Sequence, residues 1–166
     1  MSTFYTISLS LSAFLCTVVF GKMLVFDTVI MPGISLLDDV SFLRAFQVID
    51  GRIQSNEPVF VSVWVGSVIS LLVTASCAIL ALVQADRLAV LLVSTVAWLV
   101  CNWTTFTINV PLNNRVKVLD LTKMDDMTAF MERQEFETPW RKWHRFRVVI
   151  FGMVSLALTS LLALSN

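Results

Sequence analysis

Four long apolar segments, joined by short polar connections, constrain this chain of 166 residues more than any other feature. They cover residues 4–30, 58–83, 88–112 and 146–164, and the second and third contain no charged residue. A helix needs about 20 apolar residues to cross the hydrocarbon core of a bilayer. Backbone N–H and C=O groups must pair within each segment there, which favours helices. We therefore predict an all-α transmembrane four-helix bundle that forms one domain over residues 1–166.

The composition agrees with a membrane protein and excludes several classes of function. Charged residues make up 14% of the chain and the mean hydropathy is +0.79, whereas about a quarter of the residues of a soluble domain are charged. The net charge is zero, so we expect no nucleic-acid partner. The sequence has no GxGxxG, Walker or HExxH motif. Because His144 is the only histidine, a multi-histidine metal site is excluded, and we expect neither a metal nor another cofactor.

Two longer polar loops, at residues 31–57 and 113–145, lie on one side of a four-span bundle. Apolar residues recur at helical spacing over 40–53 and 124–136, which predicts two short amphipathic helices at the membrane interface. Ten of the twelve Lys and Arg residues belong to these loops or their junction with the fourth span, and Arg87 alone lies on the other side. The positive-inside rule therefore places both loops in the cytoplasm and both termini outside, in the cell (inner) membrane.

Two charged residues, Lys22 and Asp27, lie inside the first apolar segment. A charge within a span costs about 2.5–3.5 kcal/mol on insertion scales and marks a candidate functional site. In one interpretation Lys22 extends to the lipid headgroups and Asp27 is hydrated. In the other, both side chains line a polar pocket between the helices.

The third span carries polar residues and a proline near its end. Asn102 and Asn109 share a helix face, and Pro111 cannot donate a hydrogen bond to the carbonyl of Thr107. We expect the helix to kink or unwind near residues 109–113. Irregular backbone at membrane depth is tolerated where it lines a cavity, so Asn109 and Asn113 are candidate cavity residues. The asparagines could equally hold the bundle together through interhelical hydrogen bonds.

The start of the fourth span combines aromatic and basic residues, namely Trp140, Trp143, His144 and Arg147. This composition is typical of an interfacial belt with basic anchors. It also suits one wall of a pocket, because an imidazole near a carboxylate such as Asp27 can act as a general base.

The second span has small residues at intervals of four: Ser62, Gly66, Ser70 and Thr74. Such a stripe allows close helix packing. It would face another helix of this chain, a second copy, or a partner membrane subunit.

Several short motifs, taken in order, resemble a known family. Residues 26–33 (FDTVIMPG) resemble the signature F-x-x-x-V-M-P-[AG]-L, residues 109–113 match N-V-P-L-N, and residues 143–147 (WHRFR) resemble W-N-x-x-R. With residues 46–50 and 56–60 between them, these motifs resemble the anthrone oxygenase-like family of integral membrane proteins over about residues 20–160. His144 stands where that family has asparagine, and Lys22 and Asp27 replace an apolar and a small hydroxyl residue.

The resemblance implies a four-helix membrane bundle and, for its enzymes, oxidation of a polycyclic anthrone to an anthraquinone by dioxygen without an evident cofactor. We therefore expect an oxygenase-like membrane enzyme that acts on a hydrophobic aromatic or quinone-type small molecule. The catalytic base would be His144 or Asp27. The residues expected to bind the substrate are Lys22, Asn109, Asn113, Trp143 and Arg147. The alternative is a non-catalytic membrane accessory subunit or scaffold that packs through the second span.

Overall fold

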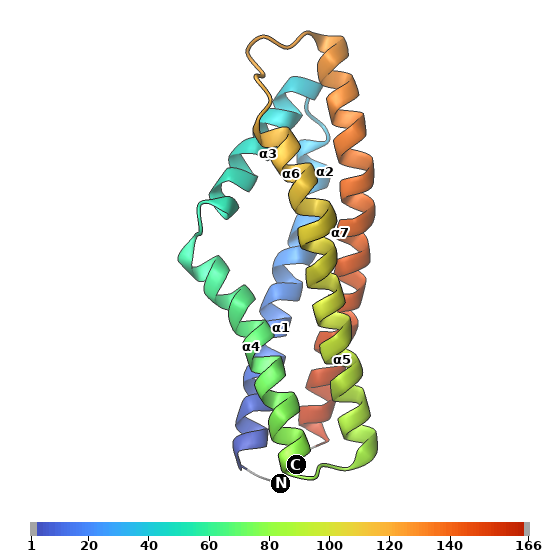
Figure 1. Cartoon of the computed structure of the whole chain (residues 1–166). Helices are drawn as coiled ribbons and strands as arrows, with labels where there is room; N and C mark the ends of the chain where they lie inside the picture. The colour runs from blue at the N-terminus through green and yellow to red at the C-terminus, as the bar shows by residue number, and fades with distance from the viewer. Residues whose placement is uncertain (1–2, 165–166) are drawn as a thin grey trace.

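The structure, a computed structural model, describes residues 3–164, so the first two and last two residues of the predicted domain lie outside it. Every secondary-structure element within these residues is helical (Figure 1). Four of the resulting helices are long and apolar enough to cross a membrane, over residues 3–34, 58–80, 85–117 and 126–163. The predicted all-α bundle with four spans is confirmed.

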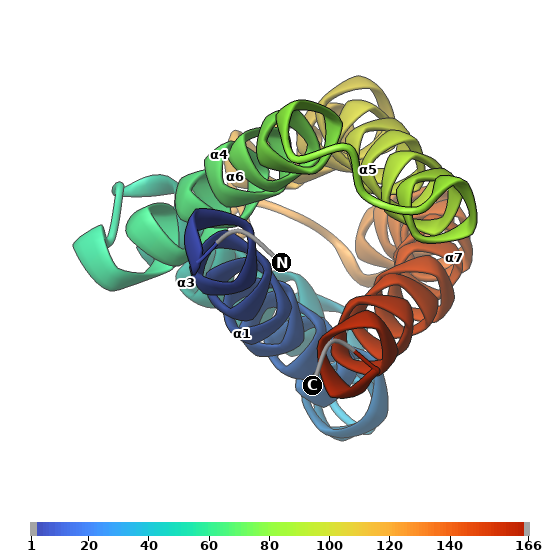
Figure 2. The same ribbon diagram turned by 90° about the horizontal axis from the view of Figure 1, so that it is seen from below.

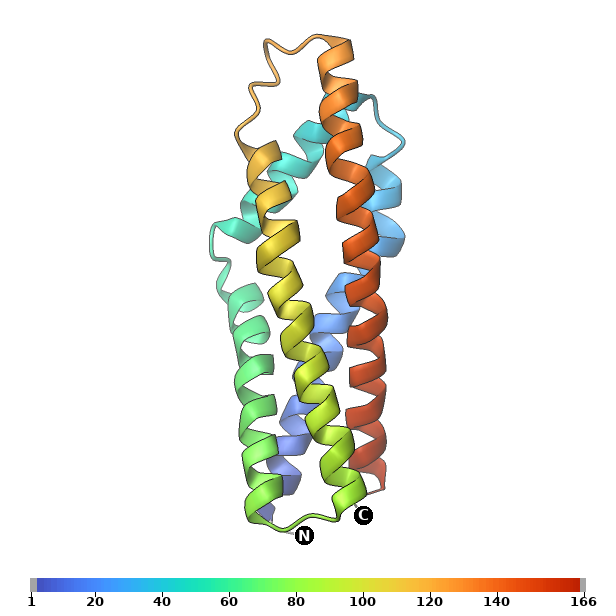
Figure 3. The same ribbon diagram turned by 45° about the vertical axis from the view of Figure 1, so that its right-hand side comes forward.

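The four long helices stand at the corners of a rough square when viewed along the bundle (Figure 2). Around the square the order is α1 (Thr3–Val25), α4 (Pro58–Leu80), α5 (Ala85–Thr104) and α7 (Asp126–Ala163). The start of α1, the end of α7 and the α4–α5 connection lie at one end of the bundle, and the longer connections lie at the other (Figure 3). Because the connection between them is short, α4 and α5 are antiparallel neighbours (Figure 3).

Local sequence signals explain where several helices begin. Asp38 precedes α3 (Asp39–Gln54) and accepts a 2.9 Å hydrogen bond from the Ser41 backbone N–H. Asp125 precedes α7 and accepts one of 2.8 Å from Thr128 N–H. Such side chains pair N–H groups that have no partner in the first turn of a helix. Pro58 opens α4, where its missing N–H costs nothing.

Two π-helical turns interrupt the first and third spans at equivalent places. They are η1 (Phe26–Ile30) and η2 (Thr105–Asn109), and a proline follows each one two residues later, Pro32 and Pro111 respectively. A proline cannot complete the normal hydrogen bond to the carbonyl four residues before it, and a wider turn accommodates this loss. The chain then continues as α2 (Met31–Ile34) and α6 (Val110–Lys117). The predicted irregularity at 109–113 is thus a wide turn just before it, and the helix does not unwind.

Helix α3 includes the first predicted amphipathic segment, but protein covers its apolar side. Phe42, Leu43 and Phe46 are fully buried. Phe46 packs against Phe136 and Trp140 of α7, with ring centroids 4.4 and 5.5 Å apart. The apolar stripe that predicted contact with the membrane surface therefore packs against α7.

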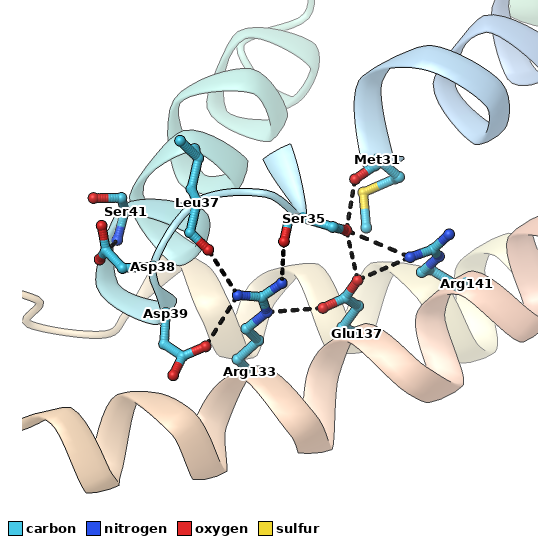
Figure 4. A network of polar contacts seen from close by, with 9 residues as sticks. All are labelled: Met31, Ser35, Leu37, Asp38, Asp39, Ser41, Arg133, Glu137 and Arg141. Atoms are coloured by element: carbon cyan, nitrogen blue, oxygen red, sulfur yellow. Dashed lines mark hydrogen bonds and ion pairs between the residues drawn. The ribbon is translucent and has the colours of Figure 1, made fainter. Parts of the chain in front are cut away.

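The second predicted short helix, at 124–136, is not a separate element. It forms one continuous helix of 38 residues with the fourth span, even though Pro139 lies inside it. Glu137 accepts hydrogen bonds from Arg133 and Arg141, four residues away on either side, and pairs at this spacing support a helix. Arg133 also binds Asp39 and the carbonyls at positions 35 and 37, which attaches the α2–α3 connection to α7 (Figure 4).

The small-residue stripe of the second span packs largely within this chain. Thr74 and Ser12 of α1 share a 2.8 Å hydrogen bond. Gly66 faces Leu15 of α1 closely enough that an added Cβ would lie 3.4 Å from Cδ1 of that leucine. The stripe therefore packs α4 against α1, and a partner bound through α4 stays a prediction.

Candidate functional site

A cavity of about 390 Å³ lies among the helices at the level of the two π turns. This volume falls in the range of small-molecule sites in proteins. The spanning helices and α3 all contribute to its wall. The lining residues are Lys22, Met23, Phe26, Phe46, Asp50, Ile53, Gln54, Phe60, Val61, Trp64, Val65, Thr105, Phe106, Asn109, Val110, Asn113, Trp140, His144 and Arg147.

The cavity unites five of the seven predicted catalytic and substrate-binding residues: Lys22, Asn109, Asn113, His144 and Arg147. Most of the wall around them is apolar or aromatic. Such a site suits a hydrophobic ring system with a few polar groups that fix its orientation.

Asp27 and Trp143 are not among the residues that line this cavity, which differs from the placement that the sequence analysis expected. Adjacent residues of a helix point about 100° apart, and Phe26 takes the position that faces the cavity. Asp27 instead approaches Arg145, with 3.5 Å between Oδ2 and Nε. Trp143 packs edge-on against Phe146, with ring centroids 5.8 Å apart.

Arg147 is the buried cation of the site, with 3% of its surface exposed. Its Nη1 donates a 2.7 Å hydrogen bond to Thr105 Oγ1, and its Nη2 lies 3.2 Å from His144 Nδ1. Its Nε is buried without a hydrogen-bond partner, and residues 3–164 provide no carboxylate in ion-pair contact with it. Buried charges in proteins are normally paired, so this guanidinium is suited to an anionic oxygen in the cavity.

The contacts of His144 determine its tautomer. Its Nε2 lies 3.0 Å from the carbonyl oxygen of Met23, which can only accept a hydrogen bond. The proton therefore sits on Nε2, and Nδ1 is free to accept from Arg147. Trp140 stacks on the imidazole, with ring centroids 4.5 Å apart and an angle of 11° between the planes. Both ring nitrogens and one ring face of His144 are thus occupied by the protein.

Asn109, at the end of η2, leaves an unpaired acceptor in the site. Its Nδ2 donates a 3.3 Å hydrogen bond to the Trp140 carbonyl, and 2% of the residue is exposed. Its Oδ1 is buried without a partner. A hydroxyl or other donor on a bound molecule could pair with this oxygen.

A series of hydrogen bonds also crosses the cavity wall and ends at Asp50, a residue that the sequence analysis missed. Trp140 Nε1 donates to Asn113 Oδ1 over 2.7 Å, and Asn113 Nδ2 donates to Asp50 Oδ1 over 2.7 Å. Asp50 lies on α3 and is only 4% exposed. Burial raises its pKa above the ordinary aspartate value, although hydrogen bonds from Gln54 and Asn113 partly oppose this.

One signal in the sequence could have identified Asp50. The residue follows Phe46 by four positions, so it continues the apolar face of α3 with a carboxylate. An acidic residue on the buried stripe of an amphipathic helix requires a polar partner. That partner, Asn113, lies 63 residues away in the chain, which is why the pairing was not apparent.

Lys22, on α1, also lines the cavity. Its Nζ is 4.4 Å from the centroid of the Phe60 ring on α4, a cation–π distance. Phe60 in turn stacks on Trp64, with centroids 5.8 Å apart. Within residues 3–164, no three His, Cys, Asp or Glu side chains are grouped closely enough to hold a metal ion.

These features define an integral membrane protein whose four spanning helices surround an aromatic cavity with a buried cation. The family model described as anthrone oxygenase matches residues 59–158, more than half of the chain, and the chain belongs to this family. The matched segment includes Asn109, Asn113, His144 and Arg147, whereas Lys22 and Asp50 precede it. The chain matches no curated protein and no solved structure.

Proposed function

We propose that this protein is a membrane-embedded oxygenase that acts on a hydrophobic aromatic or quinone-type molecule without a cofactor. The observation that carries the proposal is Arg147, a buried guanidinium without a carboxylate partner in a mainly apolar cavity. Membership of the anthrone oxygenase family supports the same reaction class. A purely structural bundle has no need for such a cavity.

The proposed substrate is a planar ring system that carries an acidic C–H group and an adjacent carbonyl or hydroxyl oxygen. Trp64, Trp140 and Phe26 offer aromatic surfaces against which rings can pack. The ring oxygen would lie at Arg147, and a ring hydroxyl would donate to Asn109 Oδ1. Lys22, on α1, would attract further negative charge. Trp140 takes the place in substrate binding that the sequence analysis gave to Trp143.

The reaction starts with loss of a proton from a ring CH₂ group, and the electron pair that remains forms an enolate. Arg147 stabilises the negative charge on its oxygen, which is the largest single contribution in many enzymes. The enolate then transfers electrons to dioxygen, and C–O bond formation with protonation gives a hydroperoxide. Loss of water breaks the O–O bond and the second C–H bond and leaves the ketone. One oxygen atom enters the product, the other leaves as water, and no external reductant is consumed.

The test is oxidation of dithranol, a dihydroxyanthrone, by the purified protein in detergent or nanodiscs. We expect anthraquinone absorbance to appear with matching uptake of dioxygen, well above the protein-free autoxidation rate. Arg147→Gln keeps a polar side chain but removes the charge, and it should lower the rate about 10²–10³-fold. Arg145→Gln is the matched control, because Arg145 has a side chain 63% exposed and faces Asp27 outside the cavity.

A rate no higher than autoxidation in the wild-type protein would overturn the proposed function. If dithranol were also not retained through purification, the accessory-subunit or scaffold interpretation would take its place. A partner membrane subunit or a second copy would then be the expected ligand, and co-purification from native membranes would identify it.

A further inference from the structure

The mechanism above requires a group in the cavity wall that accepts a proton. The sequence analysis offered His144 and Asp27. His144 Nδ1 already faces a donor of Arg147, and Nε2 carries the proton that binds the Met23 carbonyl. Asp27 does not line the cavity and lies beside Arg145. Neither residue is placed to take a proton from a molecule bound there.

Asp50 is a carboxylate in the cavity wall, and its two neighbours are oriented so that both donate to it. The Trp140 indole N–H can only donate, so it faces Oδ1 of Asn113 and turns Nδ2 of that residue toward Asp50. The Lys117 ammonium likewise can only donate. It lies 2.9 Å from Gln54 Oε1, which turns Gln54 Nε2 toward Asp50 Oδ2, 2.6 Å away.

These orientations leave Asp50 as an unprotonated acceptor with spare capacity. A carboxylate offers about four acceptor positions on its two oxygens, and the amides of Asn113 and Gln54 occupy two of them. The remaining positions are available to a proton from a ligand in the cavity that Asp50 lines.

We propose that Asp50 is the catalytic base, which removes the acidic proton from the ring system bound in the cavity. The inference rests on the oxygenase function proposed above. In this step the C–H bond of the substrate breaks and the proton bonds to a carboxylate oxygen of Asp50. The electron pair stays in the ring system as an enolate, with its oxygen at Arg147. Asn113 and Trp140 are positioning residues, because they act through Asp50.

The surroundings of Asp50 support a base stronger than an ordinary aspartate. Its burial raises its pKa, while the positive charge of Lys117 on α6 acts in the opposite direction. The other titratable or charged groups around the same cavity are Lys22 on α1 and His144 and Arg147 on α7. A proton acceptor is most effective when its pKa approaches the working pH.

The experiment separates proton transfer from oxidation. Dithranol is first added to the protein without oxygen, and the visible absorbance of its enolate is recorded. We expect the wild-type protein to hold more enolate at neutral pH than detergent alone, and Asp50→Asn to reduce it to the detergent level. After oxygen is admitted, Asp50→Asn should oxidise dithranol at least about 10²-fold more slowly. Asp50→Glu keeps a carboxylate and should recover at least a tenth of the wild-type signal.

Asp86→Asn is the matched control, since it removes an exposed carboxylate that does not line the cavity and should leave both signals unchanged. Quenching of tryptophan fluorescence by dithranol shows that each variant is folded and binds the probe.

Oxidation at the wild-type rate by Asp50→Asn would overturn the inference but leave the oxygenase function standing. If the enolate depends on Asp50 but no oxidation follows, the inference stands and the oxygenase function is overturned. If the wild-type protein forms no bound enolate at all, Asp50 is not a base for this ligand class and the inference fails. If Asp50→Asn does not fold, an enolate signal in Asp50→Glu no higher than in detergent alone overturns it.

Discussion

Nη2 of Arg147 lies 3.2 Å from Nδ1 of His144, and the imidazole proton on the opposite nitrogen binds the Met23 carbonyl. Arginine is therefore the donor in this pair, and His144 orients the guanidinium through its acceptor nitrogen. The same imidazole stacks on Trp140, whose indole N–H orients Asn113. His144 thus links the proposed oxyanion site at Arg147 with the proposed base at Asp50.

The first prediction concerns His144→Asn, which introduces the asparagine of the W-N-x-x-R signature that residues 143–147 resemble. Because His144 positions Arg147 and is not the proton acceptor, we expect the rate of dithranol oxidation to fall only about tenfold. The shape of the pH–rate profile should stay the same, and kcat measured across the pH range checks this. If the variant instead lost the change of rate with pH near neutrality, His144 would be identified as the base, since an ordinary imidazole has a pKa of about 6.5.

The second prediction is a pH dependence of stability that Asp50 causes. Burial raises its pKa in the folded protein above the ordinary value of 3.8, so the folded state binds this proton more tightly than the unfolded chain. The stability that results is fully present below the ordinary pKa and is lost as the pH rises through the raised value. Asn cannot ionise, so Asp50→Asn should lack this loss.

Thermal unfolding of both proteins in detergent across the acidic to neutral range tests the second prediction. The difference in Tm between wild type and Asp50→Asn should shift in favour of the variant as the pH rises. A difference that is independent of pH would show that Asp50 titrates alike in the folded and unfolded chain.

The third prediction concerns the attachment of the α2–α3 connection to α7 (Figure 4). Arg133 has a side chain only 12% exposed and binds Glu137, Asp39 and two carbonyls. Arg133→Gln leaves Asp39 without this partner and should lower the free energy of unfolding by about 3 kcal/mol. Arg115→Gln breaks ion pairs of a side chain that is 43% exposed and should cost about 0.2–1 kcal/mol. Equal losses in chemical unfolding of the two variants would contradict the prediction.

The fourth prediction is the orientation in the membrane, which rests on the distribution of Lys and Arg. The structure places the α4–α5 connection and the 118–125 connection at opposite ends of the bundle (Figure 3). In a background without native cysteines, Asp86→Cys should react with an impermeant thiol reagent from outside the cell. Thr122→Cys should react only after the membrane is opened. The reverse pattern would invert the topology, and labelling of both from one side would contradict the four-span arrangement.

The sequence by itself determined the four spanning helices, because predominantly apolar segments of this length can satisfy their backbone groups in lipid only as helices. It also indicated much of the cavity. Pro111 indicated irregular backbone beside Asn109 and Asn113, and Trp140 and His144 are four residues apart and so lie close on one helix face. These local signals were available without knowledge of any other element.

Only the tertiary structure decided which neighbouring residues enter the cavity. One step along a helix turns a side chain by about 100°, and this difference separates Phe26 from Asp27 and His144 from Trp143. The attachment of α7 to the α2–α3 connection depends on contacts between residues about 100 positions apart in sequence. Asp50 became part of the site because α3 folds back over α7 and meets Asn113. Helix periodicity acts over a few residues, whereas these pairings depend on how separate helices pack.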